Sequence, residues 1–123
     1  MKIPDASHPI AIEPAGYRIR ITHGGRVIAD SRRALALREA DYPVVHYIPR
    51  ADVDMSALQR TDHATHCPYK GAAAYYSIAV DGGTTINAIW TYEAPFDAVR
   101  DIAGYLAFYP DRVDAIELMP VAD

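Results

Sequence analysis

Apolar and polar residues alternate along short segments of this chain, and Gly or Pro interrupts each segment before it grows long. The clearest case is Tyr17–Ile21, in which Tyr, Ile and Ile occupy every second position and arginines occupy the positions between them. Such alternation places apolar side chains on one face of a β-strand and polar side chains on the other. The pattern predicts a mainly β fold made of short, antiparallel strands.

Glycine pairs between the alternating segments predict two hairpins. Gly24-Gly25 divides Tyr17–Asp30, and Asp81-Gly82-Gly83 separates YYSIAV from TINAIWTYE. Both turns have the composition that two-residue hairpin loops require. Further strands are predicted at Val44–Pro49 and on both sides of Pro110-Asp111-Arg112, where YLAFY and VDAIEL lie.

Three segments carry weaker patterns. Arg33–Ala40 fits a helix by its Ala, Leu and Arg content or a strand by its alternating leucines, and we favour the strand. Pro49–Thr61 reads as an irregular loop with a turn or two. A short helix is expected to begin at Pro95 or Phe96 and to end at Gly104. The expected architecture is a compact antiparallel domain spanning residues 1–123, with about eight strands and one short helix.

The composition excludes several classes of protein. The 123 residues fit one domain, half of them are hydrophobic, and the net charge of −4 argues against nucleic acid as a partner. No stretch approaches the roughly 18 apolar residues that a membrane helix needs, and the proline-interrupted N-terminus does not resemble a signal peptide. A single cysteine cannot form an internal disulfide, so we expect a cytoplasmic protein.

The segment TDHATHCPYKGAAAYYSI (61–78) concentrates the reactive side chains. It contains the only cysteine, Cys67, with Lys70 three residues on and His63 and His66 just before. These neighbours are able to stabilise a thiolate, so Cys67 is a candidate nucleophile with a histidine as base, or else a small buried residue. HATHC lacks the paired cysteines of structural zinc sites, and we expect no metal and no cofactor.

Lys70 is one of only two lysines among twelve basic residues, and it lies in a shaped turn. Pro68 fixes its own φ and Gly71 permits a positive φ, so the turn can direct Lys70 inward. There Lys70 would hold a carboxylate, a phosphate or a carbonyl group of a ligand. The alternative is a structural salt bridge from Lys70 to Glu93 or to an aspartate.

The arms of the second predicted hairpin are rich in aromatic residues. Trp90 and Tyr92 share one face of their strand, whereas Tyr75 and Tyr76 point to opposite faces. A face with Trp90, Tyr92 and one of these tyrosines would enclose a flat or cationic ligand, unless it simply forms core.

Three motifs in order give the sequence a family resemblance. YxPxxDV begins at Tyr47, TxCPxKGxAxY at Thr65 and WxYxxP at Trp90, within a region that spans roughly residues 27–114. Together they resemble the DUF427 family, small bacterial and fungal proteins of unknown function that are sometimes labelled nucleotidyltransferase-like. The resemblance implies a β-tent-like architecture, related to methionine sulfoxide reductase B domains and to the cereblon domain that holds a cyclic imide in an aromatic cage. The paired-carboxylate Gly-Ser motif of nucleotidyltransferases is not found in this sequence.

The preferred hypothesis is a pocket between the CPYKG loop and the Trp90–Tyr92 strand that binds a small polar or planar molecule. One alternative is an enzyme with Cys67 as nucleophile and Lys70 as its catalytic partner, or with the activity of the family label. A second is a structural domain that forms a homodimer. The expected ligand-binding residues are Tyr47, Arg50, Thr65, Lys70, Tyr75, Tyr76, Trp90 and Tyr92.

Overall fold

The alternating segments form the strands of a computed structural model that describes residues 1–121. Ten strands lie in this range and form three antiparallel sheets, so the mainly antiparallel β class expected from the sequence is confirmed. The strands are β1 (Ile10–Pro14), β2 (Arg18–His23), β3 (Arg26–Ser31), β4 (Leu35–Glu39), β5 (Val45–Tyr47), β6 (Leu58–Cys67), β7 (Gly71–Val80), β8 (Gly83–Thr91), β9 (Leu106–Phe108) and β10 (Ala115–Met119).

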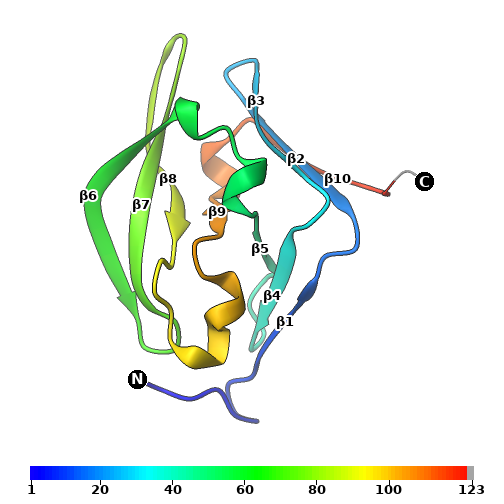
Figure 1. Ribbon diagram of the computed structural model, residues 1–123, viewed down its shortest axis with the longest axis vertical. Helices are drawn as coiled ribbons and strands as arrows, with labels where there is room; N and C mark the ends of the chain where they lie inside the picture. Colours follow the sequence, from blue (N-terminus) through cyan, green and yellow to red (C-terminus); the bar gives the residue numbers. More distant parts are fainter. Residues whose placement is uncertain (122–123) are drawn as a thin grey trace.

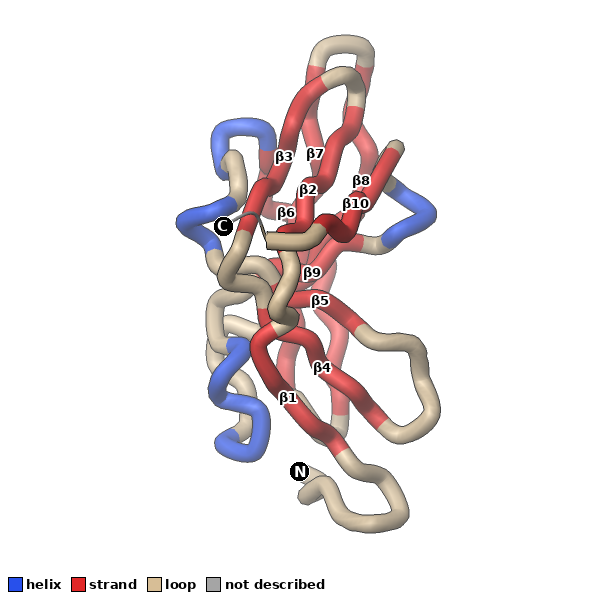
Figure 2. The backbone as a smooth tube through the Cα atoms, turned by 90° about the vertical axis from the view of Figure 1, so that its right-hand side faces the viewer, coloured by secondary structure: helices blue, strands red, loops and turns tan. Residues whose placement is uncertain are grey.

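The sheets are ordered β1-β4-β5, β10-β2-β3 and β6-β7-β8-β9. Figure 1 shows β6, β7 and β8 along one side of the molecule and β1 to β4 with β10 along the opposite side. In Figure 2, which looks onto that second side, the β10-β2-β3 sheet lies above the β1-β4-β5 sheet. The two smaller sheets therefore face the four-stranded sheet together.

The core has two parts, one beneath each small sheet. Isoleucines of β2 and β3 pack against Tyr76, Ile78 and Ile89 of the four-stranded sheet. Leu37 and Tyr47 pack against the other part of the same sheet. Ile48, directly after β5, exchanges two backbone hydrogen bonds of 2.8 Å with Leu106 of β9, which link the β1-β4-β5 sheet to the four-stranded sheet.

Both predicted hairpins are present, and Arg33–Ala40 contains strand β4, as we favoured. Strand β6 was missed, because its QRTDHATH segment has no apolar stripe and reads as a loop. β6 is an edge strand of its sheet, and most of its side chains are exposed. When both faces of a strand are exposed to solvent, apolar and polar residues need not alternate along its sequence.

The expected helix is a 3₁₀ helix, η3 (Asp97–Ile102), and it buries Val99 and Ile102. The helix is kinked at Val99, whose φ of −125° and ψ of 24° are not helical, so the segment consists of two short turns rather than one regular helix. The remaining 3₁₀ helices in residues 1–121 have three residues each, namely η1 (Arg50–Asp52), η2 (Met55–Ala57) and η4 (Pro110–Arg112). None of these short helices is long and apolar enough to cross a membrane.

Candidate functional site

The turn after β6 brings Cys67 and Lys70 together. The Lys70 amide donates to the Cys67 carbonyl at 3.3 Å, and Gly71 has a φ of 109°, a conformation that glycine adopts easily. The turn directs Lys70 inward, where 7% of the residue remains exposed, and its Nζ lies 3.6 Å from the Cys67 Sγ. Sequence reasoning could not decide whether these two side chains meet, and they do.

Glu39, at the end of β4, is the charged partner of Lys70. Lys70 Nζ donates to Glu39 Oε1, and His8 Nε2 lies 2.7 Å from Glu39 Oε2. We call His8, Glu39, Cys67 and Lys70 the lysine cluster. Burial opposes ionisation of Glu39, but hydrogen bonds from Lys70 and His8 outweigh it, so the pKa of Glu39 is lowered.

The suggested salt bridge from Lys70 to Glu93 is wrong. Glu93 instead pairs with Arg60, whose Nη1 and Nη2 donate to its two oxygens at 2.7 and 2.8 Å. Lys70 and Glu39 are 31 residues apart in the chain, so no local pattern indicated their pairing.

Most of the predicted aromatic residues lie together in the interior. Trp90 is paired with Tyr75 across the β7–β8 ladder and lies edge-on to Tyr47, 6.4 Å between ring centroids. Tyr92 and Tyr109 complete this aromatic cluster. Tyr75 also shares a hydrogen bond of 2.9 Å with Thr65.

Burial is the largest cause of the raised pKa values of these tyrosines. It raises the pKa of Tyr47 and Tyr92 above the ordinary value, and it raises that of Tyr109 to about 12. The crevice beside Trp90 has a volume of only about 80 Å³. Tyr47, Tyr75 and Tyr92 are at most 7% exposed, so their rings fill core rather than enclose a cage.

Arg50 and Tyr76 do not join the predicted group around Trp90. Tyr76 pairs with Ile89 on β8, and Arg50 Nη1 donates to its hydroxyl at 3.2 Å. The guanidinium carbons of Arg50 and Arg60 each lie 6.0 Å from the Tyr76 ring centroid. Tyr76 lies apart from the group around Trp90 because side chains alternate along β7, which places Tyr75 and Tyr76 on opposite faces, as expected.

A larger hollow lies over the start of β7. Its volume is about 410 Å³, and the short side chains of Ala72 and Ala74 form its floor and leave the space open. Ala73 contributes backbone between them, because its side chain points to the other face of β7 and is buried in the core. We call it the alanine hollow. The other lining residues are Arg60, Thr61, Asp62, His63, Ala64, Glu93 and Ala94.

A bulge in β6 shapes the rim of the alanine hollow. Arg60 pairs with Tyr76 and Ala64 with Ala74, so three residues of β6, 61–63, lie opposite one residue of β7. The Thr61 hydroxyl fastens the bulge by donating to Asn87 Oδ1 at 2.7 Å. Bulges of this kind re-aim side chains and are common beside binding sites.

The rim offers both signs of charge in fixed positions. The paired Arg60 holds the pKa of Glu93 below its ordinary value, so both groups are ionised at neutral pH. His63 lies against Tyr75 with ring centroids 4.5 Å apart, which connects the rim to the aromatic cluster. The arrangement supplies hydrogen-bond donors and acceptors around an uncharged floor.

The sequence reasoning found part of this hollow and missed the rest. His63 and the segment that contains the alanines were singled out, but Arg60 and the alanines themselves were not, and Glu93 was named only as a partner of Lys70. Three successive alanines before the two tyrosines of β7 were the available signal. In residues 1–121 no group of three or more His, Cys, Asp and Glu side chains is placed to hold a metal ion.

The model of a family described as a domain of unknown function (DUF427) matches residues 11–118, a range that includes the alanine hollow, the aromatic cluster and all of the lysine cluster except His8. A search of curated proteins found no match.

Proposed function

Since the chain belongs to the DUF427 family, whose function is unknown, we propose a function from its site: the domain binds a small, flat, polar molecule in the alanine hollow. The observation that carries the proposal is the alanine floor beneath a fixed Arg60–Glu93 pair. Pockets for small ligands have volumes of about 300 to 1,000 Å³, which favours this hollow over the crevice beside Trp90.

The ligand class follows from the groups on the rim. Arg60 and Glu93 form a two-point pair, which holds the guanidinium and the carboxylate in one orientation. A flat molecule with amide donors and acceptors matches this rim and the His63 ring. Lys70 and Arg50, which the sequence hypothesis assigned to the ligand, do not line the hollow. Arg60 lines it, as part of an ion pair with Glu93.

Filling the hollow tests this function. Ala72→Trp places a large ring on its floor at an exposed position, and we expect it to weaken binding of a flat amide at least about tenfold. The probes are uracil and succinimide, followed through backbone amide chemical shifts. In the unchanged protein the shifts should move at Ala72, Ala74 and His63.

Ala98→Trp is the matched control, because Ala98 is also exposed but lies on η3, outside the hollow. This variant should bind as the unchanged protein does. If the two variants lose affinity equally, the hollow is not the site. If neither probe moves any resonance, the proposal for flat amides fails.

The lysine cluster favours a second candidate function, an enzyme with Cys67 as nucleophile. Its support is the ammonium group of Lys70 at 3.6 Å from the sulfur, because a nearby cation stabilises a thiolate. In residues 1–121 neither His63 nor His66 makes a side-chain hydrogen bond to Cys67, and their rings lie against Tyr75 and Phe96 instead. A reducing compartment such as the cytoplasm suits this single free thiol.

The alkylation rate of Cys67 with iodoacetamide, from about pH 5 to pH 9, tests the second candidate. We expect Cys67 to react in the native protein, and we expect Lys70→Met to slow the reaction because it removes the cation beside the sulfur. Each event reports one site, because the chain has one cysteine. A thiol that reacts only in denaturant would be a packing residue.

A further inference from the structure

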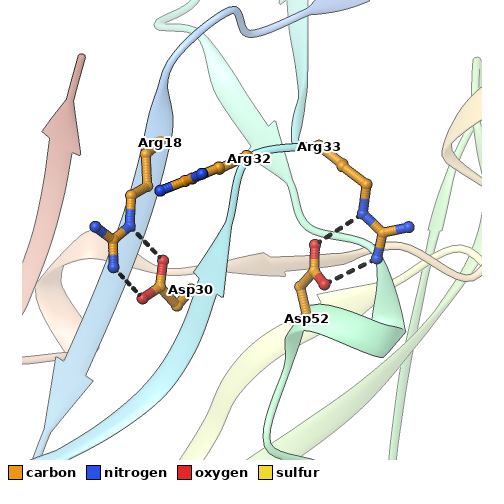
Figure 3. A pocket seen from close by; sticks show the side chains of 5 residues that line it. All are labelled: Arg18, Asp30, Arg32, Arg33 and Asp52. Atoms are coloured by element: carbon orange, nitrogen blue, oxygen red, sulfur yellow. Dashed lines mark hydrogen bonds and ion pairs between the residues drawn. The ribbon is translucent and has the colours of Figure 1, made fainter. Parts of the chain in front are cut away.

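The open end of the β2–β3 hairpin is lined by charged side chains that do not converge. Figure 3 shows Arg32 and Arg33 extending in opposite directions. Arg18 pairs with Asp30, and Arg33 pairs with an aspartate of η1. The turn at the other end of this hairpin differs, because there three polar side chains from separate elements come together.

This turn lies against the turn of the β7–β8 hairpin. Figure 1 and Figure 2 show both turns at the same end of the molecule, and His23 at the end of β2 reaches Thr85 of β8. Gly24 has a φ of 60°, and a Cβ atom there would lie 2.5 Å from Val80 Cγ2. A side chain at position 24 would therefore force Val80 to move, so the two turns are in direct contact.

A hollow with a volume of about 270 Å³ lies where the two turns meet, and we call it the hairpin hollow. No residue that lines it also lines the alanine hollow, so it is a separate feature. The lining residues are His23, Gly24, Val80, Asp81, Gly82, Gly83, Thr84, Thr85 and Asp114.

His23 lies between a hydroxyl group and a carboxylate. Its Nε2 is 2.7 Å from the Thr85 hydroxyl oxygen, and its Nδ1 is 3.5 Å from Asp114 Oδ1. The Gly24 amide donates to the other Asp114 oxygen at 2.8 Å, which holds the carboxylate in place. The Nδ1 atom is buried and makes no hydrogen bond within residues 1–121, an exception that calls for an explanation beyond packing.

The carboxylate determines which nitrogen of His23 carries the proton. A carboxylate accepts hydrogen bonds and cannot donate them, so Asp114 favours the form of the ring with its proton on Nδ1. Nε2 then keeps its lone pair and accepts from the Thr85 hydroxyl. The distance of 3.5 Å is long for a hydrogen bond, as is common at catalytic sites that hold no substrate. His23 is thus placed as a base for Thr85.

We propose that Thr85, His23 and Asp114 act as nucleophile, base and positioning carboxylate in the hydrolysis of a small uncharged ester. A nucleophile within hydrogen-bond reach of a base that a third group orients is the signature of covalent catalysis. The volume of the hairpin hollow limits the substrate to a small ester. Asp81 and Asp114 line the hollow and disfavour anionic substrates.

The reaction has two balanced steps. The Thr85 oxygen bonds to the acyl carbon while its proton passes to His23 Nε2, and the bond from the acyl carbon to the alcohol oxygen breaks as His23 returns the proton to the departing alcohol. Water then attacks the acyl-threonine and gives a proton to His23. The ester bond to Thr85 breaks, the proton returns to the Thr85 oxygen, and a carboxylic acid leaves.

The experiment measures hydrolysis of 4-nitrophenyl acetate in protein that carries Cys67→Ala, so that the thiol cannot take the acyl group. Thr85→Val removes the nucleophile and keeps a β-branched side chain, and His23→Gln removes the base. Each should lower kcat/KM at least about 100-fold, because general-base catalysis contributes about 10²- to 10⁴-fold. Thr22→Val is the matched control, since Thr22 precedes His23 on β2 but does not line the hollow. The control should keep the full rate.

Asp114→Asn tests the positioning role. The asparagine oxygen still accepts from the Gly24 amide, but its NH₂ group donates to His23 Nδ1 and favours the wrong tautomer. We expect kcat to fall at least about tenfold while KM and the melting temperature stay unchanged. An unchanged kcat would remove Asp114 from the triad and overturn the proposal.

Mass spectrometry of the quenched reaction should find the acetyl group on Thr85. The proposal is overturned if Thr85→Val hydrolyses the ester as fast as Thr22→Val, if the acetyl group is found on other residues alone, or if hydrolysis is no faster than in buffer. None of these outcomes depends on the alanine hollow or on Cys67, so the ester site and the proposed function can fail separately.

Discussion

Glu39→Gln should lower the free energy of unfolding by about 3 kcal/mol at neutral pH, because removing one partner of a buried ion pair leaves the other charge uncompensated. The side chains of Lys70 and Glu39 are only 9% and 15% exposed, so little water can replace the lost carboxylate. His8 loses its partner in the same change. For a domain of this size the melting temperature should fall by roughly 10 °C.

The effect of Glu39→Gln depends on pH in a defined direction. The pKa of Glu39 is lowered in the folded protein below its ordinary value of 4.5, so its contribution to stability is present above that pH. The contribution disappears as the pH falls through the folded pKa. Thermal melts of the variant and the unchanged protein should therefore differ most at neutral pH and converge in acid.

Two further variants isolate the cause. Glu13→Gln breaks the pair between Glu13 and Arg38, in which both side chains are about 60% exposed, and should change stability by less than about 1 kcal/mol. Adding Lys70→Met to Glu39→Gln removes the uncompensated ammonium group and should restore much of the loss. A Glu39→Gln protein as stable as the Glu13→Gln control would contradict the prediction.

Ile48→Ala should cost about 3 kcal/mol of unfolding free energy, measured by urea denaturation. Ile48 is 1% exposed and lies where β5 meets β9, so the removed methyl groups leave a cavity at the junction of two sheets. Ile86→Ala is the matched control, because Ile86 is 63% exposed on β8. The control should stay within about 0.5 kcal/mol of the unchanged protein. Equal urea midpoints for the two variants would show that the junction repacks without loss.

Local patterns were enough to predict the hairpins of this fold. Gly24-Gly25 and Asp81–Gly83 carry their own turn chemistry, so the strands on both sides could be placed before any tertiary contact was known. Strand β6 could not be placed in this way. It is held by its ladder with β7 rather than by an apolar face, and such pairing leaves no periodic signal.

In the candidate site, too, features set by local sequence patterns were predictable and features set by tertiary contacts were not. The inward direction of Lys70 follows from Pro68 and Gly71 and was predictable, whereas its partner Glu39 lies on a distant strand and was not. Trp90 and the tyrosines were recognised as a group, but only packing shows that they fill core. The alanine hollow is created by small side chains and by a bulge, features that sequence reasoning tends to pass over.

The bulge in β6 has a consequence for how copies of this domain meet. β6 carries the outer edge of the four-stranded sheet, and an uninterrupted edge would accept a strand from a second molecule. Residues 61–63 break the regular spacing of its outward-facing backbone groups, and the adjacent charges of Arg60 and Asp62 would have to be desolvated. Strand-to-strand pairing between copies through this edge is therefore disfavoured.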